Sequence, residues 1–203
     1  MKKNFLSYSL NIIKKYNQNI DDIRLDELRY GLEGFYLTIT KLIVIVILSL
    51  LLGIFKEMFI MLIAFNILRF TGFGLHATKS SICLFSSSLI FIIFPFLSKI
   101  LSFPFYLKVI LILIAIILTF LYAPADTEKR PIINVKRRKI YKWITTINCI
   151  ILSIISLFVS DIYCNLIIFG IYSEVIMILP ITYKIFNLSY NNYKKYGLNI
   201  ENV

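Results

Sequence analysis

Two side chains that lie close together in the sequence could form a nucleophile and base pair. His76 is the only histidine of the chain, and Cys83 follows it seven residues later. A cysteine becomes a strong nucleophile when a base takes its proton or when nearby positive charge favours the thiolate. Lys79 supplies such a charge. Ser80 or Ser81 could cap a helix with Cys83 in its first turn, where the helix dipole favours a thiolate. The stretch is therefore a candidate site for nucleophilic catalysis.

The spacing of this pair restricts the local backbone. On one continuous helix, His76 and Cys83 would share a face but stand two turns apart, ~10 Å, which is beyond hydrogen-bond reach. Gly72 and Gly74 precede the histidine and allow a sharp turn. We therefore expect a helix break within residues 75–82, with His76 on a re-entrant loop folded back over the start of the next helix.

The pair alone leaves its role open. A single histidine in such a position can act in catalysis or only bind lipid headgroups. A third group that would orient the histidine is absent from the stretch; Asp126, Glu128 and Glu174 are candidates, and the sequence does not choose among them. A metal site is not expected, because soft ligands are too few, and no cofactor is predicted.

The composition indicates that these residues lie in a membrane protein. Of 203 residues, 59% are hydrophobic and only 16% are charged, and the mean hydropathy is +0.81. One small core cannot bury that much apolar surface, so lipid must be the solvent. The charged N-terminal region holds no continuous apolar run, so we expect no cleavable signal peptide. Three cysteines, two of them in apolar runs (Cys149 and Cys164), suggest no disulfide framework.

We predict an all-α polytopic membrane protein with six transmembrane helices in a single membrane domain, residues 1–203. Its parts are interfacial N-terminal helices (1–36), a membrane core (37–181) and a C-terminal tail (182–203). The six predicted spans are 37–54, 58–68, 82–97, 105–122, 144–159 and 164–181. The second holds about eleven residues and cannot cross a bilayer core of ~20 residues unless flanking residues join it or the glycine-containing stretch dips inward.

Two helices are expected before the first span. The first, residues 4–16, has an apolar stripe flanked by lysines and should lie on the membrane surface. The second should begin near Asp21 or Asp22 and run into the first span. The two stripes consist of Phe5, Tyr8, Ile12 and Tyr16, and of Leu25, Leu28, Leu32 and Phe35.

The basic residues predict the orientation of the chain. With a cytoplasmic N-terminus and six spans, all but three of the 22 Lys and Arg fall on the cytoplasmic side, the exceptions being Lys56, Lys99 and Lys108. This bias explains the net charge of +11 without a nucleic-acid partner. We predict a multi-pass protein of the cell membrane with both termini and the candidate site on the cytoplasmic side.

Three charged residues fall inside predicted spans. Lys41 and Lys108 are expected to extend to the headgroups. Glu174 lies in the middle of the last span, where a carboxylate needs a partner or becomes protonated. Its partner could be Lys108, Asn66 or a hydroxyl group, and a catalytic role is the alternative.

The loop between the fourth and fifth predicted spans, up to Lys142, is strongly basic. Its run Lys136–Lys139 is either an orientation signal beside anionic lipid or a docking surface for an acidic peptide. Pro124 and Pro131 would stiffen the preceding part of the loop and hold such a surface near the site.

These pieces together resemble the AgrB family, the accessory gene regulator B membrane endopeptidases of Gram-positive quorum sensing. The resemblance spans nearly the whole chain. It rests on Arg29-Tyr-Gly31, Arg69, Gly74-Leu-His76-Ala77, Cys83, Tyr122-Ala-Pro-Ala, Lys129-Arg130-Pro131-Ile132, Glu174 and Leu179-Pro180-Ile181.

The resemblance implies that His76 and Cys83 are the catalytic pair of a cysteine endopeptidase, a thiol protease. Its substrate would be a short AgrD-like propeptide with an amphipathic N-terminal part, a central Cys or Ser and an acidic C-terminal tail. Cys83 would cut off the tail and hold the remainder as an acyl-enzyme, and the peptide's own nucleophile would close the thiolactone or lactone ring of the autoinducing peptide. Supporting or substrate-binding residues would be Arg69, Gly72, Gly74, Ser80, Lys129, Arg130 and Glu174.

Other partners and functions follow from the same features. Membrane lipid is an expected partner, and the resemblance also implies a homodimer. The main alternative function is a small membrane transporter or peptide exporter without peptidase activity, with Glu174, Lys108 and Asn66 along its path. A non-catalytic membrane scaffold is a third.

Overall fold

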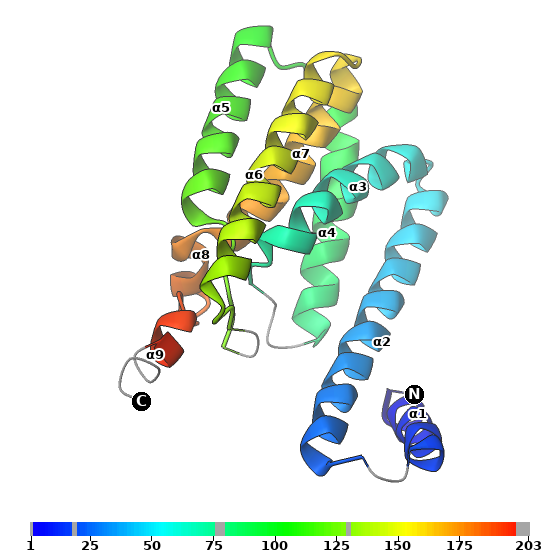
Figure 1. Ribbon diagram of the computed structural model, residues 1–203. Helices are drawn as coiled ribbons and strands as arrows, with labels where there is room; N and C mark the ends of the chain where they lie inside the picture. The colour runs from blue at the N-terminus through cyan, green and yellow to red at the C-terminus, as the bar shows by residue number, and fades with distance from the viewer. Residues whose placement is uncertain (1, 18–19, 76–79, 129–130, 198–203) are drawn as a thin grey trace. The chain divides into compact units, whose positions relative to one another are not determined.

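The computed structural model describes residues 2–17, 20–75, 80–128 and 131–197, and for Ser80 to Cys83 it describes the backbone alone. The described part of the chain is helical, with one isolated bridge between Phe73 and Ala125 and no strand (Figure 1). Its helices are α1 (Lys2–Tyr16), α2 (Asp22–Leu51), α3 (Phe55–Gly72), α4 (Ser80–Ile100), α5 (Phe105–Tyr122), α6 (Val135–Leu157), α7 (Asp161–Ile178), α8 (Pro180–Ile185) and α9 (Tyr193–Gly197).

The chain divides into two compact units, of which Met1–Leu48 is the first. Within it, α1 packs on α2 through the rings of Phe5 and Tyr36, whose centroids lie 5.2 Å apart, and through an ion pair of Lys2 with Glu33. The other members of the predicted apolar stripe of α1 remain exposed: Tyr8, Ile12 and Tyr16. An interfacial helix needs such an exposed apolar face. The second predicted helix does continue into the first apolar segment, as α2.

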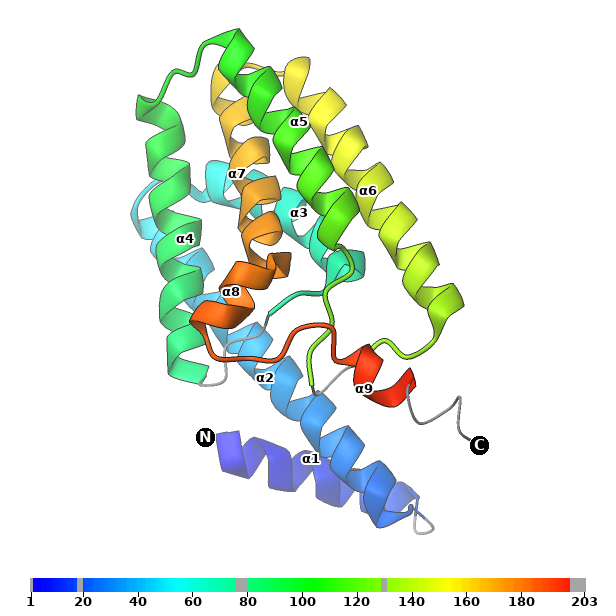
Figure 2. The same cartoon turned by 90° about the vertical axis from the view of Figure 1, so that its left-hand side faces the viewer.

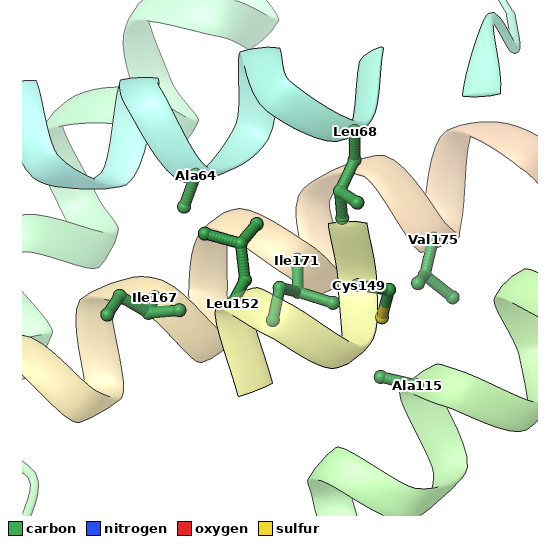
Figure 3. Close-up of a cluster of buried hydrophobic side chains, with 8 residues drawn as sticks. All are labelled: Ala64, Leu68, Ala115, Cys149, Leu152, Ile167, Ile171 and Val175. Carbon is green, nitrogen blue, oxygen red and sulfur yellow. The ribbon is translucent and has the colours of Figure 1, made fainter. Parts of the chain in front are cut away.

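The second unit, Ser49–Val203, is built around α7. This helix packs against α3, α4, α5 and α6, and Figures 1 and 2 show it between α4 on one side and α5 and α6 on the other. A helix that is apolar on all sides is either covered by other helices or exposed to lipid, and most residues of α7 are buried within the protein. The main core cluster, drawn in Figure 3, joins four helices through Ala64, Leu68, Ala115, Cys149, Leu152, Ile167, Ile171 and Val175.

Helix α3 crosses this bundle obliquely in both views (Figures 1 and 2). It comes close to α7 at Gly170, where an added Cβ would lie 2.8 Å from the Cβ of Ala64 and 2.8 Å from the carbonyl oxygen of Met61. The missing side chain of Gly170 therefore allows the close crossing, which fixes where α3 ends relative to α7.

Four of the described helices are long and apolar enough to cross a membrane: α2 from Arg24, α5, α6 and α7. The predicted count of six spans is not confirmed. The 18 residues of α3 include three charged side chains, Lys56, Glu57 and Arg69, and the part of α4 with described side chains forms a shorter apolar helix, Leu84–Ile100.

Two of the boundaries that differ from the predicted spans have a clear local cause. Helix α6 begins at Val135 rather than near residue 144, because Asn134 caps it: its side-chain oxygen accepts a hydrogen bond from the backbone N–H of Arg137, 3.1 Å away. The basic run therefore lies on a helix. At the other end of the chain, α7 ends at Ile178, because the residue before Pro180 is kept out of the helical conformation.

Candidate functional site

The described members of the predicted site fall at one end of the second unit. The starts of α4 and α6 and the ends of α5 and α7 meet there, together with α8 and α9 (Figures 1 and 2). The candidate site stretch and the basic run, which are far apart in the sequence, are therefore at the same end of the bundle.

The segment of residues 72–75 begins at the end of α3, and backbone hydrogen bonds attach it to two other parts of the chain. Towards the loop of residues 123–126, Gly74 donates its N–H to the carbonyl oxygen of Ala125 (2.8 Å), and Ala125 donates to that of Gly72 (2.9 Å). Towards α7, the N–H of Leu75 donates to the carbonyl oxygen of Met177 (2.9 Å). The backbone that leads to His76 is thus fixed by two distant parts of the chain.

Both predicted glycines are required, for different reasons. Gly72 is the last residue of α3, and a Cβ there would lie 2.8 Å from Oε1 of Glu174. Gly74 adopts φ +80°, which side chains disfavour, and its Cβ would lie 2.8 Å from both Arg69 Nη1 and the carbonyl oxygen of Met177. Gly74 therefore permits the turn, whereas Gly72 permits a close approach of α7.

A buried ion pair lies beneath this segment. Nη1 of Arg69 lies 3.3 Å from Oε2 of Glu174, whose side chain is 1% exposed. The other guanidinium nitrogen, Nη2, donates to the carbonyl oxygens of Leu75 (2.7 Å) and Gly74 (3.4 Å). Arg69 thus joins α7 to the backbone just before His76.

The partner of Glu174 is not among those named from the sequence. Lys108 is buried and pairs with Asp161 at 2.6 Å, and Asn66 donates to the carbonyl oxygen of Leu62 within α3. Arg69 was expected at the end of the second span but not as the partner of Glu174. A carboxylate inside a predicted span indicates that a charged or polar partner lies nearby. This signal does not specify which residue of the membrane region is that partner.

The break predicted before Cys83 is confirmed. Helix α3 ends at Gly72, residues 73–75 are not helical, and α4 begins at Ser80, so Cys83 lies in the first turn of α4. His76 and Lys79 lie outside the described residues, as do Lys129 and Arg130. The Cys149 and Cys164 side chains are buried among neighbouring helices, as predicted.

Two of the three candidate carboxylates are engaged elsewhere. Asp126 is 1% exposed, and its two oxygens accept the backbone N–H groups of Asn192 (2.9 Å) and Tyr193 (2.7 Å). Glu128 accepts from the Ser189 hydroxyl (2.8 Å) and from the Lys195 ammonium (3.2 Å), and these two groups hold its pKa below the usual range. The sequence does not reveal that both hold the C-terminal segment.

The four residues of the basic run, Lys136–Lys139, differ in their contacts. Arg138 is half-buried; its guanidinium lies 3.6 Å from the ring centre of Tyr193, and Nη2 donates to Oδ1 of Asn191 (3.4 Å). Lys136, Arg137 and Lys139 are exposed. Within the described part of the chain these three make no salt bridge, so their charges remain available to a partner.

Among the residues that the structure describes, no group of three or more His, Cys, Asp or Glu side chains is arranged for metal binding.

Comparisons with known proteins agree over most of the chain. The family model of accessory gene regulator B matches residues 6–178. An AgrB-like protein of Clostridium acetobutylicum is 35% identical over 190 residues, covering 92% of this chain and 91% of the relative. Accessory gene regulator protein B of Staphylococcus aureus is 30% identical over 164 residues, covering 80% and 87%. An AgrB-like protein of Listeria monocytogenes is 34% identical over 173 residues, covering 84% of each chain. No solved structure matches.

Proposed function

The chain belongs to the AgrB family, accessory gene regulator B, and from that premise we propose that it is a membrane-embedded cysteine endopeptidase of quorum sensing. Its substrate is a short AgrD-like propeptide. The enzyme removes the C-terminal tail of this peptide and promotes cyclisation of the remainder to the autoinducing peptide.

The proposed reaction uses the Cys83 sulfur twice. His76 takes the thiol proton, and the thiolate attacks the scissile carbonyl carbon. A carbon–sulfur bond forms, the carbon–nitrogen bond breaks, and His76 returns the proton to the nitrogen of the departing tail. The peptide's own thiol or hydroxyl, losing its proton to His76, then attacks the acyl-enzyme. It closes the thiolactone or lactone ring and releases Cys83 with its proton.

Exchange of one thioester for another is nearly balanced in bond energy, so ring closure to a thiolactone requires no ATP provided that water is kept out. A site at the edge of a membrane favours this exclusion. The first turn of α4 supports the thiolate of Cys83, since free N–H groups and the helix dipole favour negative charge there.

The observation that carries the proposal is the held segment of residues 72–75. Its three backbone hydrogen bonds and the Arg69 contacts fix the chain immediately before His76, and α4 then begins three residues before Cys83. Such fixed geometry is what a nucleophile and base pair requires. A histidine that only binds headgroups has no need of it.

The contacts of the three candidate carboxylates support one choice for the group that orients His76. Both carboxylate oxygens of Asp126 and Oε1 of Glu128 accept hydrogen bonds from the C-terminal segment. Oε1 of Glu174 is buried and has no hydrogen-bond partner among the described residues. We assign the orienting role to Glu174, which Arg69 holds in place.

The acidic tail of the substrate is proposed to bind the exposed charges at the start of α6, Lys136, Arg137 and Lys139, together with Lys129 and Arg130. Opposite charges raise the association rate and orient the peptide. Because the basic residues mark the cytoplasmic side, we place the site and both termini there, in a multi-pass protein of the cell membrane. A homodimer belongs to the same proposal.

Substitution of the pair tests the proposal. Cys83→Ala and His76→Ala should each abolish cleavage of a co-expressed propeptide, while the protein still accumulates in the membrane. Cys149→Ser and Cys164→Ser are matched controls and should retain cleavage, because both thiols are buried among helices away from α4's first turn. Cleavage at the wild-type rate by Cys83→Ala would exclude the mechanism. Peptide flux into vesicles that persists in that variant would indicate an exporter instead.

A further inference from the structure

The C-terminal segment of residues 189–193, which we call the clasp, lies beyond the residues matched by the family model, which end at 178. It is nevertheless bound to the loop that holds the site. Asp126 accepts two backbone N–H groups of the clasp, at 2.7 and 2.9 Å. Its neighbour Ala125 exchanges two backbone hydrogen bonds with Gly72 and Gly74. One dipeptide therefore connects the clasp to the segment that precedes His76.

Apolar contacts follow the same path. Leu75, Ala125 and Tyr183 are buried in one cluster, and Leu188 and Tyr190 pack against its edge. The rings of Tyr183 and Tyr190 lie 5.0 Å apart in an edge-to-face arrangement, and the Tyr183 hydroxyl donates to the carbonyl oxygen of Asp126 (3.1 Å). The side chain immediately before His76 thus shares a core with the C-terminal segment.

The clasp is also stiffened within itself and from α6. Asn192 is 1% exposed, and its side chain donates to the carbonyl oxygen of Ser189 (2.9 Å). Arg138 covers the Tyr193 ring and contacts Asn191. Burial of the Asp126 carboxylate would be unfavourable without the backbone N–H groups of Asn192 and Tyr193. The arrangement with the clasp bound to Asp126 is therefore the one that satisfies this carboxylate.

We propose that Asp126 is a positioning residue of the enzyme: by binding the backbone of residues 192 and 193, it locks the 123–126 loop, and this loop sets the geometry of the segment leading to His76. The inference rests on the proposed function for its effect on catalysis. In this proposal Asp126 binds the clasp and does not orient His76. The C-terminal segment then contributes to the geometry of the catalytic site.

Two perturbations test the same link from opposite sides. Asp126→Ala removes the acceptors, and a stop after Leu188 removes the clasp. Each should lower kcat for propeptide cleavage about tenfold with KM changed less than twofold, because substrate contacts are untouched. Asp126→Asn keeps one acceptor and should recover part of the rate. Combining Asp126→Ala with the truncation should cost no more than either change alone, since both break one connection.

Matched controls separate this effect from general damage. A stop after Gly197 keeps all described clasp contacts and should retain activity within twofold. Amide exchange provides a readout independent of catalysis: in Asp126→Ala and in the stop after Leu188, exchange at Gly74 should rise at least tenfold, while amides near Ile171 in the core stay protected.

The outcomes are distinct. Unchanged protection of Gly74 with unchanged kcat would overturn the role of the clasp. Equal loss of protection at Gly74 and near Ile171 would show general destabilisation and also overturn it. If the wild-type protein does not cleave the propeptide, the proposed function fails, and exchange at Gly74 alone still decides whether the clasp holds the segment.

Discussion

Replacement of Gly74 by alanine should destabilise the protein more than the same replacement at Gly53. Both glycines adopt positive φ, +80° at Gly74 and +66° at Gly53, so both variants incur the strain of a Cβ in this region, about 1–2 kcal/mol. At Gly53 nothing lies within 4 Å of the added atom. The Gly53 variant therefore measures the conformational cost alone.

At Gly74 the added Cβ would also meet two groups at 2.8 Å, Arg69 Nη1 and the carbonyl oxygen of Met177. The Met177 oxygen belongs to the backbone of α7 and cannot move aside easily. Relief of the clash would break the hydrogen bond from Leu75 to Met177 and the contact of Arg69 with Leu75. We expect about 2–4.5 kcal/mol beyond the Gly53 value, since a neutral hydrogen bond contributes about 0.5–1.5 kcal/mol and one to a charged group about 1.5–3 kcal/mol.

The assay is denaturant unfolding of both purified variants in the same detergent, with propeptide cleavage measured in parallel. Gly74→Ala should have the lower unfolding midpoint and almost no cleavage, whereas Gly53→Ala should cleave at close to the wild-type rate. Equal midpoints for the two variants would refute the reasoning, because the contacts at Gly74 would then contribute nothing beyond its φ.

Three further predictions concern charge. Charge reversal of the exposed lysines, Lys136→Glu with Lys139→Glu, should raise KM for the propeptide at least tenfold and leave kcat nearly unchanged; an unchanged KM would remove α6 from the substrate site. Arg69→Gln and Glu174→Gln should each lower the free energy of unfolding, and the sum of the two losses should exceed the loss in the double variant by about 0.5–3 kcal/mol in a double-mutant cycle. A double variant whose loss equals that sum would mean that the pair does not interact. Burial raises the pKa of Tyr190 to about 12, although nearby Arg138 opposes this. A raised pKa means that the neutral phenol stabilises the fold below its unfolded value near 10, and this stabilisation is lost as pH rises from about 10 to about 12. Phenolate absorbance should lose a titration step near pH 12 in Tyr190→Phe, and an unaltered titration would contradict the burial argument.

Local sequence was sufficient for much of the helical structure. The apolar run over 105–122 predicts α5 with the observed bounds, because such a run is stable only as a helix in lipid. Gly72 and Gly74, together with the His76–Cys83 spacing, predict the interruption between α3 and α4. Both depend on neighbours along the chain.

Where local signals compete, the sequence was a poorer guide. The basic run looked like part of a loop, yet a capping residue, Asn134, starts α6 before it. Charges within α3 left the predicted count of six spans unconfirmed. Hydropathy alone predicts neither the effect of a capping residue on where a helix begins nor the effect of charged residues on whether a helix spans the membrane.

The sequence by itself determined the membrane class, the family and the pair of residues expected to carry the chemistry, since composition, order and spacing are properties of the chain alone. Only the tertiary structure decided which groups meet. Arg69 and Glu174 are 105 residues apart, and their pairing depends on how closely α3 crosses α7 at Gly170. The partners of Asp126 likewise depend on the path of a segment more than 60 residues away. Such contacts are made where helices cross and loops meet, and no local pattern encodes those positions.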